Sequence, residues 1–149
     1  MTTALTHAHP DCASRQTVKT VLAGRSRGVF QGKILVERVA QKTDGYQMNQ
    51  ALLLSERAEM DSKPQLEIYA DDVKCSHGAT VGALDEDALF YLRSRGVPAA
   101  TARAMLVRAF LAEATEGVAD EGARAALDAA VEAWWARHGD AALAGAGGA

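Results

Sequence analysis

Apolar and polar residues alternate in short runs through the first half of the chain, up to about residue 82. The clearest alternation covers residues 17–21, 29–34 and 65–69, and this period of two predicts short β-strands. Three dipeptides typical of turns punctuate these runs: Asp44-Gly45, Lys63-Pro64 and Asp71-Asp72. Because no helical pattern separates the runs, a sheet built from βαβ units is excluded. The pattern leaves a sandwich, a barrel or a β-helix.

The segment 47–55 fits two kinds of element. Its Leu, Met and Gln residues favour a helix by propensity. Its length and its turn-rich flanks fit a buried strand as well. We interpret it as a strand.

The second half of the chain has the pattern of helices. Asp85 is a good N-cap for a first helix, which Gly96 ends. Pro98 suits the first turn of a second helix that runs to about residue 116. A third helix is predicted from about residue 120 to 138, with its end at Gly139. The predicted organisation is a β-rich domain at 1–82, a three-helix domain at 83–139, and a mobile Gly/Ala-rich tail at 140–149.

The second helix carries more apolar surface than one core requires. One face of it holds Ala102, Met105, Leu106, Ala109 and Phe110. The roughly opposite face holds Ala104, Val107 and Leu111. The third helix has one apolar stripe, with Trp135 at its margin: Ala123, Leu127, Ala130, Val131 and Trp134. Two interpretations stay open: the second helix is sandwiched within its own chain, or Val107, Leu111 and Trp135 bind a partner protein.

Composition narrows the classes of function. The net charge is −3 and no run of Lys and Arg reaches five, so neither nucleic acid nor an anionic membrane is an expected partner. No stretch approaches the roughly 20 apolar residues of a membrane span, and the N-terminus lacks the pattern of a secretory signal. We therefore expect a soluble, cytoplasmic protein. In that compartment Cys12 and Cys75 are expected to be free thiols.

Cys75 and His77 are the candidate metal ligands. They lie two apart on a predicted strand, so both side chains point to the same face. A thiolate and an imidazole together suit borderline metals such as iron. The alternative interpretation is a buried cysteine and a hydrogen-bonded histidine. His7 and His9 have the same spacing, and we expect them to be a solvated pair near the N-terminus.

No catalytic motif is complete, and no catalytic residue is assigned. Residues 24–28 place Ser26 between arginines but do not form a G-x-S-x-G elbow. Residues 78–82 are bounded by glycines but lack the Lys-Ser/Thr ending of a phosphate loop.

Several segments resemble one known family. The longest is residues 64–82, which reads PQLEIYADDVKCSHGATVG, followed by FYLRSRG at residues 90–96. Shorter matches are residues 12–16, 28–32, 42–45 and 49–54. Together they resemble the SufB/SufD family of SUF iron–sulfur cluster assembly scaffolds. The SufD branch is closer than the SufB branch, which differs around residues 74–78.

The resemblance implies a mixed α and β fold: the C-terminal coils of a right-handed parallel β-helix, followed by a small helical domain. It also implies that the chain begins inside the β-helix, so that the open end could self-associate. The implied function is that of a non-catalytic scaffold that pairs with SufB and docks the SufC ATPase through its C-terminal helices. His77 matches a histidine implicated in cluster assembly at the SufB interface, while Cys75 is expected to be mainly structural.

A count of ligands limits what this chain could hold. Iron–sulfur clusters usually take four protein ligands, mainly cysteines. Two distant cysteines are too few, so no cofactor is expected to be held stably by this chain alone, and a transient cluster would be shared with a partner subunit. The rival hypothesis is a small β-rich metal- or ligand-binding enzyme that uses Cys75 and His77.

Overall fold

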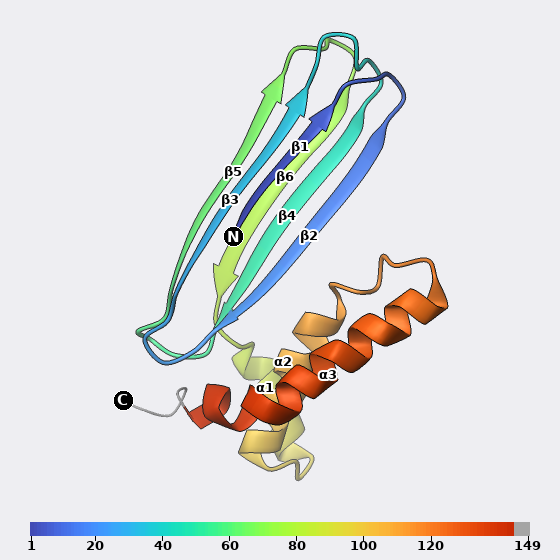
Figure 1. Cartoon of the computed structure of the whole chain (residues 1–149). Coiled ribbons are helices and arrows are strands. Elements are labelled where there is room, and N and C mark those ends of the chain that lie inside the picture. Colours follow the sequence, from blue (N-terminus) through green and yellow to red (C-terminus); the bar gives the residue numbers. More distant parts are fainter. Residues whose placement is uncertain (145–149) are drawn as a thin grey trace. The chain divides into compact units, whose positions relative to one another are not determined.

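The computed structural model describes residues 1–144, in which six strands are followed by three helices (Figure 1). The strands are β1 (Thr2–His7), β2 (Ala13–Leu22), β3 (Arg27–Val36), β4 (Asp44–Leu53), β5 (Glu59–Ile68) and β6 (Lys74–Gly82). The helices are α1 (Glu86–Ser94), α2 (Ala99–Ala112) and α3 (Glu121–Ala144). The predicted mixed class is confirmed, as is the strand interpretation of the segment 47–55, most of which lies in β4.

Consecutive strands alternate between two three-stranded parallel sheets, in the orders β1-β3-β5 and β2-β4-β6 (Figure 1). In the first sheet Thr2 pairs with Gln31 and His7 pairs with Val36. In the second, the N–H of Asp44 donates to the Cys12 carbonyl at 2.9 Å. No helix lies between one strand and the next, as the sequence pattern required. The alternation suits a β-helix, and the right-handed β-helix itself stays a prediction.

The chain divides into two compact units. The first unit comprises Met1–Val18, Gly28–Gln50 and Met60–Thr80. The second unit comprises Lys19–Arg27, Ala51–Glu59 and the chain from Val81 onward. The domain boundaries inferred from the sequence, at residues 82 and 139, stay a prediction.

Each unit has its own apolar core. In the first unit, Ile34, Val36, Ala40 and Ala70 are buried, and Leu5, Leu66, Val73 and Cys75 pack against them. In the second unit, Leu52, Leu54 and Val107 are buried. Around these three pack Val21, Ala23, Leu84, Phe110, Leu111, Trp135, Ala142 and Leu143. Within residues 1–144, no helix is both long and apolar enough to cross a membrane.

The first helix begins and ends as predicted. The Asp85 side chain accepts hydrogen bonds from the N–H groups of Asp87 (2.9 Å) and Ala88 (3.0 Å), which is the N-cap arrangement. Beyond the last turn, Gly96 has φ of +86°, a conformation that costs glycine little. These local signals act within a few residues, so the sequence alone is enough to place them.

The second helix ends earlier than predicted, at Ala112 instead of about residue 116. The Thr115 hydroxyl donates to the Ala112 carbonyl at 2.8 Å and also contacts Asp128 Oδ1 at 2.7 Å. Thr115 is buried, so this side chain satisfies a carbonyl at the end of the helix and turns the chain towards α3.

The third helix continues past Gly139 to Ala144, so its predicted end was wrong. Gly139 is buried inside the helix, where a Cβ would lie 2.6 Å from the Trp135 ring. Glycine is therefore present for space and not to stop the helix. Of the predicted mobile tail, residues 140–144 are helical and residues 145–149 lie outside the described part of the chain.

The packed stripe of α3 also differs from the prediction. Trp135 packs in the core, whereas Trp134 is 44% exposed and Leu127 is 46% exposed. The stripe runs instead through Val131, Trp135 and Gly139. Consecutive residues of a helix point in different directions, so the packing of Trp135 in the core leaves the adjacent Trp134 facing outward.

Two predicted turns lie within strands. Pro64 is inside β5 and not between strands. Within residues 1–144, β5 pairs only with β3, so it is an edge strand, where the missing N–H of proline is tolerated. Asp44 and Gly45 begin β4.

Candidate functional site

Cys75 is the second residue of β6 and is half-buried. Its side chain packs against the core of the first unit. A Cβ on Gly45, the neighbouring position on β4, would lie 3.2 Å from Cys75 Sγ. The thiol therefore fills space that exists because residue 45 has no side chain.

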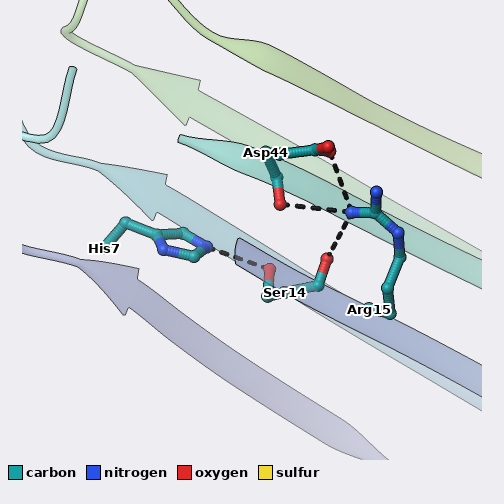
Figure 2. A network of polar contacts seen from close by, with 4 residues as sticks. All are labelled: His7, Ser14, Arg15 and Asp44. Carbon is teal, nitrogen blue, oxygen red and sulfur yellow. Dashed lines mark hydrogen bonds and ion pairs between the residues drawn. The ribbon is translucent and has the colours of Figure 1, made fainter. Parts of the chain in front are cut away.

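Two more side chains approach the same point. Ser14 Oγ lies 3.7 Å and His7 Nε2 lies 3.8 Å from where a Cβ of Gly45 would stand. Figure 2 shows His7, at the end of β1, pointing toward Ser14 on β2, and the two share a hydrogen bond of 2.9 Å. His7 is only 5% exposed, whereas His9 is exposed. The expectation of a solvated His7–His9 pair was therefore wrong, because the Ser14 contact and the core enclose His7.

His77 lies on the same strand as Cys75, two residues further along, and is exposed. Alternation along a strand puts both side chains on one face. The structure thus places the two sequence-predicted ligands on one strand, and their role as metal ligands stays a prediction. In the described part of the chain, no group of three or more His, Cys, Asp or Glu side chains could hold a metal ion.

A charged surface lies beside the thiol. Arg15 Nη1 donates to Asp44 Oδ1 at 2.9 Å and to the backbone carbonyls of Ser14 (3.0 Å) and Asp44 (3.2 Å), as Figure 2 shows. The hydrogen bond from Arg15, then the attraction of its charge, holds the pKa of Asp44 below its usual range. The same hydrogen bond raises the pKa of Arg15.

These two residues line a surface pocket of about 470 Å³ together with Tyr46, Lys74, Cys75 and Ser76. The Cys75 thiol is therefore bordered by core on one side and by this pocket on the other. Of the charged groups that line the pocket, Arg15 is paired with Asp44, and Lys74 adds one further positive charge.

The strand that carries Cys75 and His77 is an edge. Within residues 1–144, β6 is hydrogen-bonded only to β4. Along it, Lys74, Ser76, His77 and Ala79 are exposed. Unpaired N–H and C=O groups on such an edge can pair with another strand.

The three predicted partner-binding residues are mostly enclosed. Val107 is fully buried, and Leu111 and Trp135 are half-buried in the core of the second unit. Val107 therefore offers no free surface, whereas a partner-binding role of Leu111 and Trp135 stays a prediction.

Other large apolar side chains of the second unit are exposed: Phe90 (73%), Tyr91 (57%), Met105 (46%), Leu127 (46%) and Trp134 (44%). The sequence pattern did not indicate that Phe90 and Tyr91 would be exposed. Phe90 and Tyr91 follow the buried Leu89 directly in α1. A helix buries one stripe, so consecutive large apolar residues could have signalled that some of them face outward.

Comparison with known proteins connects this arrangement to a family. Residues 1–110 match the model of the SufBD core domain of SUF system FeS cluster assembly. SufD of Escherichia coli (strain K12) is 54% identical over 118 residues, covering 79% of this chain and 28% of that protein.

More distant relatives agree. Protein ABCI7, chloroplastic, of Arabidopsis thaliana is 48% identical over 109 residues, covering 72% of this chain and 23% of the relative. SufD of Bacillus subtilis (strain 168) is 35% identical over 112 residues, covering 75% of this chain and 26% of the relative. The chain thus spans about a quarter of the length of these curated relatives. It belongs to the SufB/SufD family of the SUF system of iron–sulfur cluster assembly.

Proposed function

We propose that this chain is part of a non-catalytic, cytoplasmic SufD-type scaffold that helps to assemble iron–sulfur clusters at an interface with SufB. The observation that carries the proposal is the open edge of β6, with exposed His77 beside half-buried Cys75. The names of its relatives as assembly proteins support the same function. The strand order further supports the β-helix that the family resemblance implies.

Pairing with SufB would use the β6 edge. Strand addition to an open edge gains main-chain hydrogen bonds, and exposed side chains such as Ala79 and Thr80 give it specificity. The cluster is the cargo of this interface. His77 and Cys75 would offer one imidazole and one thiol, and the partner would complete the set of about four ligands.

Docking of the SufC ATPase would use the second unit. Aromatic anchors such as Phe90 and Tyr91 often dominate binding energy when a partner buries them. Val107 cannot serve because its own unit encloses it. In this scheme SufC supplies the ATP-driven motion, and the scaffold responds.

Co-purification tests the proposal. The chain is co-expressed with tagged SufB and SufC, and retained protein, iron and acid-labile sulfide are measured. We expect His77→Ala to keep SufB but lose iron and sulfide, with exposed Ser76→Ala as the matched control on the same strand. We expect Phe90→Asp with Tyr91→Asp to lose SufC and keep SufB. Wild-type protein that retains neither partner would sink the proposal.

A second candidate, a small metal- or ligand-binding enzyme, rests on the His7–Ser14 hydrogen bond beside Cys75. An imidazole bonded to a hydroxyl near a thiol resembles the pairing that activates nucleophiles. Such a protein would hold stoichiometric metal through gel filtration, or lose a measurable activity in His7→Ala. A scaffold would emerge nearly free of metal, and metal analysis of the purified chain separates the two.

A further inference from the structure

Gln47 is a fully buried polar residue in β4 with one unsatisfied atom. Its Nε2 donates to Gln16 Oε1 on β2 at 2.6 Å. Its Oε1 is buried and has no hydrogen-bond partner. A buried acceptor without a partner is costly, so such an atom calls for an explanation.

The direction of this free oxygen follows from its contacts. A Cβ on Gly32 would lie 2.5 Å from Gln47 Oε1 and 2.6 Å from Nε2. The amide therefore packs against Gly32, and its Nε2 is engaged by Gln16 on β2, one of the two neighbours of β4. The other neighbour of β4 is β6, which is where a donor for Oε1 is to be sought.

The residue of β6 opposite Gln47 is His77. Two contacts fix this register: Cys75 Sγ lies against Gly45, and Met48 Cε lies 2.8 Å from where a Cβ of Gly78 would stand. In each pair the β6 residue follows its β4 neighbour by the same number of positions in the sequence. Gln47 and His77 have that same separation, so they face each other. Neighbouring strands are about 4.8 Å apart, which is within reach of an imidazole ring.

We infer that Gln47 positions His77, by accepting a hydrogen bond from one ring N–H through its buried Oε1. Gln47 is held by its hydrogen bond to Gln16, and His77 is exposed and lies opposite Gln47 on the neighbouring strand. A histidine that donates one N–H to a carbonyl is fixed in one tautomer. The other ring nitrogen then keeps its lone pair available for a metal or a proton.

That the second ring nitrogen of His77 binds a metal or a proton rests on the proposed function. The hydrogen bond between His77 and Gln47 does not. The competing explanation is that Gln47 only cross-links β4 to β2 through Gln16. A structural role of that kind would affect stability and leave the His77 tautomer unchanged. The tautomer is therefore the quantity to measure.

The experiment uses nitrogen NMR of the His77 ring in the complete chain, at a pH at which the ring is neutral. We expect wild-type protein to show one dominant tautomer, and folded Gln47→Leu to shift to the mixture of a free histidine. Asn49→Leu is the matched control. Asn49 is equally buried on β4 and also has an unpartnered oxygen, but its neighbour on β6 is Ala79.

The spectrum of the wild-type protein tests the inference by itself, even if Gln47→Leu does not fold. A free-histidine mixture in the wild type overturns the inference, as does a folded Gln47→Leu with the wild-type tautomer. The proposed function fails separately: if His77→Ala keeps full iron and sulfide while the tautomer still depends on Gln47, the positioning stands and the cluster role does not.

Discussion

The two compact units differ in how their elements are enclosed. In the part of β4 that lies in the first unit, every second residue from Gly45 to Asn49 is buried. In α3 of the second unit, residues 121–130 are all exposed, and only a few side chains of the later turns reach the core. A strand between two neighbours must fit both of them at each alternate position, whereas α3 is fixed by a few contacts. Tolerance to substitution should therefore be low along β4 and varied along the helices.

The largest expected effect is at Val107 of α2, a buried position in the second unit, where many helix residues are exposed. Val107 is fully buried, so Val107→Asp places a charge in the core and should cost several kcal/mol. We expect loss of the helical circular dichroism signal at room temperature. Leu127→Asp, at a position that is 46% exposed, should change the free energy of unfolding by no more than about 0.5 kcal/mol. Equal melting temperatures for the two variants would contradict the assignment of the core.

The next effect tests close packing in the first unit. Gly32→Ala would bring a Cβ within 2.6 Å of both the Gln47 amide and the Phe30 ring. Both residues are buried and have little room to move, so overpacking should cost about 1–3 kcal/mol.

Gly82→Ala is the matched control for Gly32→Ala. A Cβ on Gly82 would meet nothing within 4 Å, and no loss of stability is expected. Urea denaturation of both variants checks the comparison. A Gly32→Ala protein as stable as Gly82→Ala would mean that the interior of this unit is loosely packed.

A smaller effect weighs helix propensity against packing. In an open helix, Gly→Ala stabilises by about 1 kcal/mol. At Gly139 the new Cβ would lie 2.6 Å from the Trp135 ring and displace it from the core. We expect a net loss of about 1 kcal/mol and a red shift of tryptophan fluorescence. Gly122→Ala, near the exposed start of α3, supplies the control, since its Cβ would meet only the exposed Asp120 Oδ1, at 3.3 Å, and no core side chain. A stabilised Gly139→Ala would show that Trp135 contributes little to this core.

The features that the sequence predicts well are local ones. Alternation indicates the strands, and Asp85 and Gly96 indicate the ends of α1, because each of these signals acts within a few residues. The family is evident from a long run of matched residues around Cys75 and His77.

The features that the sequence does not predict depend on tertiary neighbours. The pattern around Pro64 favours a turn because nothing local shows that β5 is an edge strand. Gly139 has the appearance of a helix end because its contact with the Trp135 ring is a matter of packing. A solvated His7 is the natural expectation because Ser14 encloses it only when β1 and β2 are brought together. The Gln47–His77 register has the same origin.

The smallest effect concerns the exposed Arg15–Asp44 ion pair beside Cys75. Arg15 lowers the pKa of Asp44 in the folded chain, so the pair stabilises the fold at pH values above the ordinary carboxyl pKa. That contribution is lost as the pH falls through the lowered pKa. In Arg15→Gln the pKa of Asp44 should rise towards its usual value, and melting temperature should change only slightly because both side chains are exposed. NMR titration of the Asp44 carboxyl in both proteins measures this directly. An identical pKa in the two would mean that the ion pair does not persist in solution, and that the pocket beside Cys75 is lined by independent charges.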